Sequence, residues 1–423
     1  MKISNKNSEN KAILIGIDRG KGNAREAIEE LEALCNTLDI EVEEVLIQKR
    51  KKPDIRYYIG KGKLGKLKKL LELFDVDLVV ADDELTPIQV KNLEEFLNVK
   101  LLDRTQVILE IFARHAITEE GKIQVELARL QYELPRFVGM GTKLSRLGGG
   151  IGTRGPGEKI LQRKRSEVRK RITVLKKRLK EIEKDREIQR RKRKERKYYR
   201  ISIVGYTNAG KSSLLNLLTS SNDAKVEDKL FATLEPITRR MKLPSGRIVL
   251  VSDTVGFIRK LPHTLVAAFR ATLNEIKESD LLIHLVDISD PHFENKMNES
   301  LKVLEEIGAA DVPKITVFNK IDLVAKEKIE NVMSKYPDAV FVSVKKSSGI
   351  KELFCRVEES LWEMDERVKI RILSEKVGIL YSFLDRIEII SENYMNGHVE
   401  VELRGTEGAV REAIGRLRGE VIK

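Results

Sequence analysis

Residues 205–212 read GYTNAGKS and stand between the strand-like run ISIV and the helix-like run SLLNLL. A glycine-rich loop between a strand and a helix is the context that a Walker A phosphate loop requires. Glycine lets the backbone wrap around phosphates so that its amides point inward. Lys211 is placed to neutralise β- and γ-phosphate oxygens, and the Ser212 hydroxyl to bind Mg²⁺. The stretch predicts a P-loop nucleotide-binding domain built on a parallel sheet.

Three further motifs follow in the order that a GTP site requires. DTVG (253–256) ends the strand IVLVS, NKID (319–322) ends the strand KITVF, and SVK (343–345) follows AVFV. Asp253 supplies an acidic group near Mg²⁺, and the amide of Gly256 is expected to reach the γ-phosphate. Asp322 can accept two hydrogen bonds from the guanine N1–H and exocyclic amine, a donor pair that adenine lacks. The sequence therefore predicts GTP as the ligand.

The predicted site divides into catalytic, metal and nucleotide contacts. The catalytic roles fall to Lys211, Thr233 and Gly256, and Mg²⁺ would be held by Ser212, Thr233 and, through a water, Asp253. The expected GTP contacts are Gly205, Tyr206, Thr207, Asn208, Ala209, Gly210, Lys211, Ser212, Ser213, Phe231, Ala232, Thr233, Asp253, Thr254, Val255, Gly256, Asn319, Lys320, Asp322, Ser343, Val344 and Lys345.

Two residues of this site qualify the mechanism. Phe257 stands where Ras-like GTPases carry the glutamine that orients the attacking water, so we expect slow hydrolysis until a binding partner helps. Asn208 has two open interpretations: it stabilises the loop, or it helps to hold a K⁺ ion between phosphates. Turnover in potassium and sodium buffers separates them.

Four domains are expected along the chain: an α/β domain (1–115), a helical hairpin (116–197), the GTPase domain (198–365) and a small α+β domain (366–423). In the first, the strands AILIGID, EVEEVLI, RYYIG, DLVVADD and VKLLD alternate with helix-like runs. In the last, a strand and a helix precede two strands around Asn396–Gly397, and a second helix follows. The predicted fold class is thus α/β, with a helical hairpin and an α+β appendage.

The hairpin carries the basic charge of the chain. Apolar residues at Ile123, Leu127, Leu130 and Leu134 form one seam, and heptad-spaced residues from Leu161 to Ile182 form another. Residues 159–200 contain 21 Lys and Arg against 6 Asp and Glu, an excess larger than the +13 of the whole chain. Such a segment usually faces a polyanion.

Composition bounds the remaining possibilities. No apolar run approaches the roughly 18 residues that a membrane helix needs, and residues 1–11 have no apolar signal core. We expect a cytoplasmic, monomeric protein without a membrane span. Cys35 and Cys355 lack metal-ligand spacing, and both are predicted to be buried thiols.

The sequence resembles the HflX family of translation GTPases over nearly its whole length. The resemblance rests on the following segments: YYIGKGKL (57–64), EGKIQVELARLQYELPR (120–136), LSRLGGGIGTRGPGE (144–158), VGYTNAGKS (204–212), FATLEP (231–236) and DTVGFIRKLPHTLVAAFRATL (253–273). It implies a GTPase that binds the large ribosomal subunit and its rRNA, and that separates or rescues idle or stalled ribosomes. EKILQ (158–162) and GKSS (210–213) depart slightly from the family pattern, and the C-terminal domain matches only in outline.

Two other glycine patterns copy the G-x-G-x-x-G spacing of dinucleotide-binding loops. GGGIGTRGPG (148–157) joins the arms of the hairpin without a preceding strand, so it is either an RNA-contacting tip or a flexible connector. GKGKLG (60–65) follows the expected strand RYYIG, with Asp82 and Asp83 about 20 residues later, which keeps an ATP site open. The alternative function is therefore an RNA-remodelling protein with an additional ATP site. The candidate RNA contacts are Lys61, Lys63, Arg146, Gly149, Gly150 and Arg154.

Overall fold

The fold is taken from a computed structural model that describes residues 10–20, 22–136, 156–192, 198–219, 231, 237–260 and 275–422. Contacts between residues divide the chain into two compact units. The first comprises Met1–Ile182, Asp228–Leu234 and Arg259–Phe269, and the second comprises Glu183–Glu227, Glu235–Ile258 and Arg270–Lys423. Phe231, Arg259 and Lys260 therefore belong with the N-terminal residues, although the segments on either side of them in sequence belong to the second unit.

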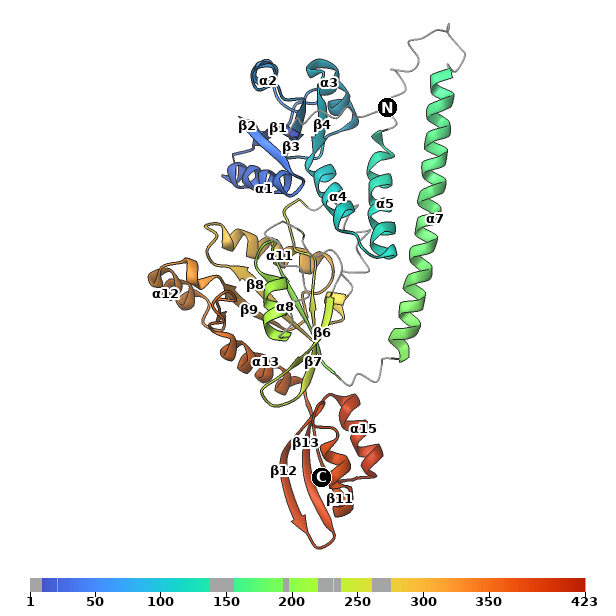
Figure 1. The fold of residues 1–423 in the computed structure, drawn as a ribbon, viewed down its shortest axis with the longest axis vertical. Helices are drawn as coiled ribbons and strands as arrows, with labels where there is room; N and C mark the ends of the chain where they lie inside the picture. The colour runs from blue at the N-terminus through green and yellow to red at the C-terminus, as the bar shows by residue number, and fades with distance from the viewer. Residues whose placement is uncertain are drawn as a thin grey trace. The chain divides into compact units, whose positions relative to one another are not determined.

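The first unit contains a four-stranded parallel sheet in the order β2-β1-β3-β4 (Figure 1). Ile13 and Ile15 of the central strand β1 pack against Leu64 and Leu67 of α2. Leu14, on the opposite face of the strand, is also fully buried, and burial of both faces explains the continuous apolar run. The strands are β1 (Asn10–Asp18), β2 (Ile40–Lys49), β3 (Leu78–Ala81) and β4 (Lys100–Asp103), and the helices are α1 (Ala24–Thr37), α2 (Lys61–Phe74), α3 (Pro87–Leu97) and α4 (Arg104–His115).

The prediction of a strand at RYYIG is wrong. The Asp54 carboxylate accepts the backbone N–H groups of Arg56 at 2.9 Å and Tyr57 at 3.0 Å, and Tyr58 is left-handed with φ 64°. A turn held by an aspartate side chain therefore occupies these residues, because its local hydrogen bonds compete with strand pairing.

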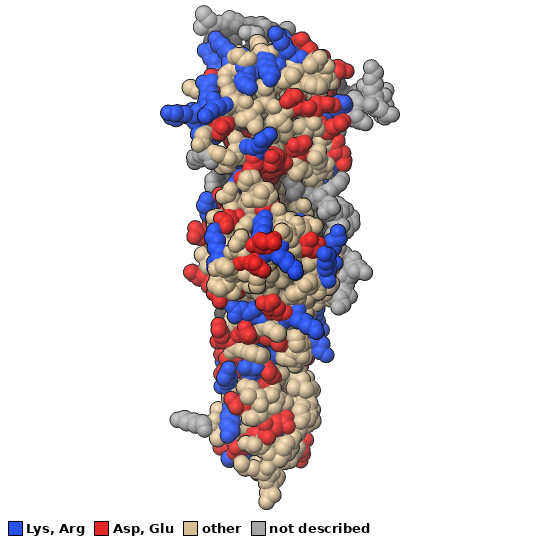
Figure 2. Space-filling view, turned by 90° about the vertical axis from the view of Figure 1, so that its left-hand side faces the viewer, with Lys and Arg blue, Asp and Glu red and all other residues tan. Residues whose placement is uncertain are grey.

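The first unit also contains α5 (Glu119–Glu133) and, up to Ile182, α7 (Pro156–Lys192), two antiparallel helices that lie side by side (Figure 1). Ile123 and Leu127 of α5 pack against Ile172 and Leu175 of α7, so the predicted hairpin is confirmed over these residues. Across its exposed surface α7 presents a basic face made of Arg163, Lys164, Arg169, Lys170, Arg171, Lys176, Lys177, Arg178 and Lys180. By contrast, the face of the molecule drawn in Figure 2 intersperses Lys and Arg with Asp and Glu.

The second unit contains a six-stranded sheet, in the order β10-β9-β8-β5-β7-β6 (Figure 1). All its pairs are parallel except the edge pair β6–β7. The elements are β5 (Arg200–Gly205), α8 (Lys211–Thr219), β6 (Ile237–Lys242), β7 (Ile248–Asp253), β8 (Leu281–Asp287), α11 (Phe293–Glu306), β9 (Lys314–Asn319), the 3₁₀ turn η2 (Ile321–Leu323), α12 (Lys326–Lys335), β10 (Val340–Phe341) and α13 (Ile350–Met364). The sequence did not predict β6.

The C-terminal residues form an antiparallel sheet, in the order β12-β13-β11-β14, with α15 packed on one face (Figure 1). The predicted turn between two strands is confirmed, and Gly397 adopts φ 82° there. The elements are β11 (Glu366–Leu373), η3 (Ser374–Lys376), α14 (Val377–Tyr381), β12 (Ile387–Met395), β13 (His398–Gly405), α15 (Glu407–Leu417) and β14 (Glu420–Ile422).

Two composition-based expectations have different outcomes. Within the described part of the chain, every helix is too short or too polar to cross a bilayer. Cys35 is buried but Cys355 is exposed, so the prediction of two buried thiols is wrong for the second. Cys355 lies on the solvent side of α13, whose opposite side packs through Leu353, Val357 and Leu361.

His284 makes the second unit sensitive to acid. Burial, aided by the charges of Lys314 and Lys211, lowers the pKa of this β8 residue to about 4. Below the ordinary histidine pKa the unfolded chain binds a proton that the folded chain does not, so stability falls as the pH drops from about 6.5 to 4. We expect a loss of about 3 kcal/mol across that window from this residue alone.

His284→Leu tests this directly. The thermal midpoint of the variant should fall less than that of the wild type between pH 7 and pH 4.5. His398→Leu, which changes an exposed histidine, is the control and should follow the wild type. Equal pH dependence of His284→Leu and wild type would contradict the assignment.

Candidate nucleotide-binding site

The loop between β5 and α8 is shaped by glycines that no other residue can replace without strain. Gly205 has φ 150°, and a Cβ on it would lie 2.2 Å from the carbonyl oxygen of Leu285 in β8. Gly210 has φ 96°, and its Cβ would lie 2.5 Å from Asn319 Nδ2. The loop backbone therefore passes close to Leu285 of β8 and to the side chain of Asn319, the last residue of β9. Such tight passage of the backbone is what a loop that wraps around phosphate requires.

Lys211 lies at the start of α8, folded back over this loop. Its Nζ donates to the carbonyl oxygens of Tyr206 at 2.8 Å and Gly205 at 3.2 Å. Burial lowers the pKa of Lys211 to about 8, although the nearby charge of Asp253 opposes this. A buried ammonium ringed by loop carbonyls is positioned to exchange these acceptors for phosphate oxygens.

Ser212 and Asp253 form the part of the site that suits a divalent cation. Ser212 Oγ donates to Asp253 Oδ2 at 2.6 Å, where the end of β7 meets the start of α8. Among the described residues, no group of three or more His, Cys, Asp or Glu could hold a metal ion. The donor set fits Mg²⁺ nevertheless, since this hard cation takes few protein oxygens and completes its shell with waters and substrate phosphates.

The base-recognition motifs come together through Asn319. Its Nδ2 donates to Ala209 O at 2.9 Å, and its Oδ1 accepts the Val344 N–H at 3.1 Å. This buried amide therefore ties the phosphate loop to the SVK segment. The carboxylate of Asp322 accepts from Ser343 Oγ at 2.6 Å, which lowers the pKa of Asp322 and keeps it ionised. The arrangement leaves an ionised acceptor beside the loop, as guanine recognition requires.

The DTVG segment lies directly against the phosphate loop. The N–H of Phe257 donates to Gly205 O at 3.0 Å, and the N–H of Thr207 donates to Phe257 O at 2.9 Å. A Cβ on Gly256 would approach Thr207 Cγ2 to 2.8 Å and Lys211 Nζ to 3.0 Å, so only glycine fits here. The Phe257 side chain is 2 % exposed. An apolar, buried ring at this position offers no group to orient a water.

Several remaining predicted contacts can also be placed. Thr254 Oγ1 donates to Ile203 O at 2.7 Å, which anchors DTVG to β5, and Lys320 Nζ forms an ion pair with Asp287 at 2.6 Å. Asn208 is exposed, with a left-handed φ of 61°, and the Phe231 ring packs edge-on against Phe112 at a centroid distance of 4.7 Å. Ala232, Thr233, Arg146, Gly149, Gly150 and Arg154 lie outside the described residues.

GKGKLG has none of the local structure of a dinucleotide loop. Gly60 is the N-cap of α2 and follows the Asp54 turn rather than a strand, which corrects the predicted context. Nothing lies within 4 Å of a Cβ placed on Gly62 or Gly65, so no close backbone approach requires these glycines. Lys61 and Lys63 lie in the first turn of α2, where Lys61 is exposed to solvent and Lys63 is partly buried.

Two residues beside the site were not singled out from the sequence. Asp287 ends the central strand β8 and pairs with Lys320 at 2.6 Å, and Lys296 of α11 lies 5.3 Å from the centre of the Tyr206 ring. The position of Asp287 at the carboxyl end of a central parallel strand was the available signal, because ligands gather at that edge of an α/β sheet.

Comparison with known families covers most of the chain. Residues 25–113 match a family model described as GTP-binding GTPase N-terminal, and residues 115–193 match GTP-binding GTPase Middle Region. Residues 200–320 match a model described as 50S ribosome-binding GTPase.

Individual relatives agree with these matches. GTPase HflX of Caldanaerobacter subterraneus subsp. tengcongensis is 46% identical over 412 residues, covering 97% of this chain and 94% of the relative. GTPase HflX of Escherichia coli is 37% identical over 397 residues, covering 93% of each. Among solved structures, a GTP-binding protein from Sulfolobus solfataricus in complex with GDP is 28% identical, covers 83% of this chain and 98% of its own, and has a TM-score of 0.42.

The family models and the relatives confirm the predicted resemblance and the prediction of a GTP hydrolase, and the observed sheets confirm the predicted fold class. The chain belongs to the HflX family of P-loop GTPases.

Proposed function

We propose that this GTPase binds the large ribosomal subunit and uses GTP binding and hydrolysis to dissociate or rescue idle or stalled ribosomes. The buried Phe257 carries the proposal: a GTP site without a water-orienting side chain needs a partner to reach a useful rate. The match of residues 200–320 to a model described as 50S ribosome-binding GTPase and the basic face of α7 support an RNA-containing partner.

The proposed roles follow the geometry of the site. Lys211 neutralises the β- and γ-phosphates, the amide of Gly256 contacts the γ-phosphate, and Asp322 selects guanine. Ser212, Thr233 and, through water, Asp253 would hold Mg²⁺, which would supply positive charge beside the transferred phosphoryl group. Asn208 is exposed and left-handed, which is compatible with stabilising the loop and with holding K⁺ between phosphates. Comparison of GTP turnover in potassium and in sodium buffer distinguishes these two roles.

The proposed complex forms in the cytoplasm between one copy of the protein and one large subunit. In this proposal the glycine-rich sequence between α5 and α7 makes the RNA contact, through the side chains of Arg146 and Arg154 and the main-chain amides of Gly149 and Gly150. Lys61 and Lys63 add phosphate contacts at the start of α2.

Deletion of residues 148–155 is expected to weaken sedimentation with large subunits at least about tenfold in the presence of a non-hydrolysable GTP analogue, since several phosphate contacts are lost together. The affinity for GTP should not change, because the nucleotide site lies in other residues. The wild type should sediment with subunits more strongly with the analogue than with GDP.

A deletion variant that sediments like the wild type would contradict the proposed contact. Loss of both ribosome and GTP binding would show that the deletion disturbs the fold instead. Association that is the same in GDP and in the analogue would contradict a nucleotide-dependent cycle.

A further inference from the structure

The strand order of the N-terminal sheet contains a reversal point of the kind at which open parallel sheets bind ligands. Its order β2-β1-β3-β4 places β1 and β3 side by side, with the chain leaving them toward opposite edges of the sheet. In open parallel sheets, ligands bind outside the carboxyl ends of the strands at such a reversal. Here Asp18 ends β1 and Arg19 follows it, and Asp82 and Asp83 follow β3.

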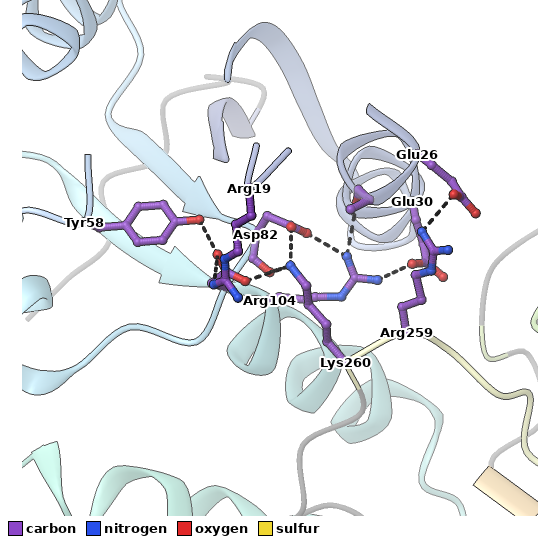
Figure 3. A network of polar contacts seen from close by, with 10 residues as sticks. Arg19, Glu26, Glu30, Tyr58, Asp82, Arg104, Arg259 and Lys260 are labelled. Atoms are coloured by element: carbon purple, nitrogen blue, oxygen red, sulfur yellow. Dashed lines mark hydrogen bonds and ion pairs between the residues drawn. The ribbon is translucent and has the colours of Figure 1, made fainter. Parts of the chain in front are cut away.

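The chain itself supplies the occupant. The ammonium of Lys260 bonds to the carboxylates of Asp82 and Asp83, the latter at 2.7 Å, and Arg259 forms an ion pair with Glu26 at 2.9 Å (Figure 3). Lys260 lies 178 residues from Asp82 in sequence. A dibasic pair from the segment after DTVG therefore fills the ligand position of the N-terminal sheet.

The surroundings form an acidic socket, defined here as Glu26, Glu30, Asp82 and Asp83. Arg104, which is 2% exposed, bonds to Asp82 at 2.9 Å and to Glu30, and it holds these two carboxylates in place (Figure 3). Arg19 pairs with Asp83 at 3.1 Å. The four carboxylates of the socket carry four negative charges, and Arg104 and Arg19 offset two of them. Arg259 and Lys260 neutralise the remaining two.

The socket is preorganised for a cation. Tyr58 donates its hydroxyl to Asp83 at 2.8 Å, fixing that carboxylate toward Lys260. Burial alone would raise the pKa of Asp83, but Lys260, Tyr58 and Arg19 together bring the pKa below its ordinary value. The carboxylate is thus ionised throughout the neutral pH range, where docking is electrostatic.

In sequence, Arg259 and Lys260 directly follow the segment that is proposed to contact the γ-phosphate. Lys260 is four residues after Gly256 and three after Phe257, whose backbone bonds to the phosphate loop. Phe231 of FATLEP also packs within the first unit, against Phe112 of α4. A fixed Lys260 limits how far Gly256 can move toward a γ-phosphate.

We propose that the acidic socket is a receptor for Arg259–Lys260 and that docking there opposes the recruitment of Gly256 by GTP. This rests on the proposed role of the Gly256 amide at the γ-phosphate. By linkage, GTP and the socket then compete for the same segment, whereas GDP, which lacks the γ-phosphate, does not disturb it. The N-terminal domain thereby lowers the preference of the site for GTP over GDP.

The test measures two affinities in the full chain. Dissociation constants for GDP and for a non-hydrolysable GTP analogue are measured with Mg²⁺ for wild type, Lys260→Met, Asp83→Asn and the double variant. The preference for the analogue over GDP should rise about five- to tenfold in each single variant. The double variant should match either single one, because the two residues form one interaction.

Two matched controls remove the same charges from ion pairs elsewhere. Lys335→Met breaks a pair with Glu294, and Asp39→Asn breaks a pair with Arg114. Both controls should keep the wild-type preference for the GTP analogue over GDP. Lys260→Arg, which retains the positive charge, should also keep it. Hydrogen exchange of a peptide spanning residues 256–260 should become faster in Lys260→Met and Asp83→Asn, but not in the controls.

The proposal is overturned if the preference is unchanged in both single variants, or if their effects add in the double variant. Unchanged hydrogen exchange would likewise overturn docking itself. These measurements contain no ribosome, so a negative result would contradict the docking of Lys260 in the socket and would not bear on ribosome binding. Conversely, absence of ribosome binding in the sedimentation experiment would not bear on the socket.

Discussion

Lys211→Met is expected to weaken the binding of both GTP and GDP about 10²- to 10³-fold. Lys211 Nζ lies over the loop carbonyls of Gly205 and Tyr206, where phosphate oxygens would replace them. Hydrogen bonds to charged groups contribute about 1.5–3 kcal/mol each, and at least two would be lost. Methionine keeps roughly the length of the lysine side chain, so the loss of nucleotide affinity measures the contribution of the ammonium group rather than the effect of a cavity.

Folding should survive this change, because removal of a buried, poorly solvated ammonium costs the apo protein little. Fluorescent GDP titration gives the affinity, and the thermal midpoint without nucleotide checks the fold. Lys335→Met, an exposed position on the same domain, is the control and should bind normally. Near-normal affinity of Lys211→Met would contradict the assignment of the phosphate loop.

Asp322→Asn is expected to change base specificity from guanine to xanthine. The ionised Asp322 is suited to accept the N1–H and exocyclic amine of guanine, and Asn offers one acceptor and one donor instead. GTP affinity should fall about 10²- to 10⁴-fold, since the hydrogen bond from N1–H loses its charged acceptor and the Asn amide then faces the exocyclic amine of guanine donor to donor. XTP carries a carbonyl in place of the amine, so it should bind the variant far better than the wild type.

Competition of GTP, XTP and ATP against labelled GDP measures the change. Ser343 can still donate to the Asn side chain, which preserves the local geometry that the 2.6 Å hydrogen bond provides. Asp311→Asn, at an exposed position, should retain the preference for GTP. A variant of Asp322 that still prefers GTP over XTP would show that this carboxylate does not read the base.

The GTP site was largely predictable because its chemistry is local in sequence. Each motif ends a strand, and the strands are parallel, so their carboxyl ends meet at one edge. Gly205 and Gly210 adopt positive φ, a requirement that a glycine-rich loop expresses directly in its sequence. Asp253 and Ser212, 41 residues apart, approach to 2.6 Å for the same reason.

The errors came from interactions that the local pattern does not express. RYYIG has the aromatic and β-branched composition of a strand, but the Asp54 carboxylate binds the backbone of the next residues and forms a turn. The edge strand β6 reads ITRRMK, in which Arg239 stands on the same, less exposed side as Ile237 and Met241 and so breaks the apolar alternation. The acidic socket joins Asp82 to Lys260, and no short-range signal reveals so distant a pair.

GTP turnover with and without purified large ribosomal subunits tests the central claim most directly. Phe257 is buried and apolar, so the protein alone should turn over slowly, and large subunits should raise the rate by about tenfold or more. Small subunits at the same concentration serve as the control and should have a lesser effect. A rate that large subunits leave unchanged, or a high rate in the protein alone, would contradict the account.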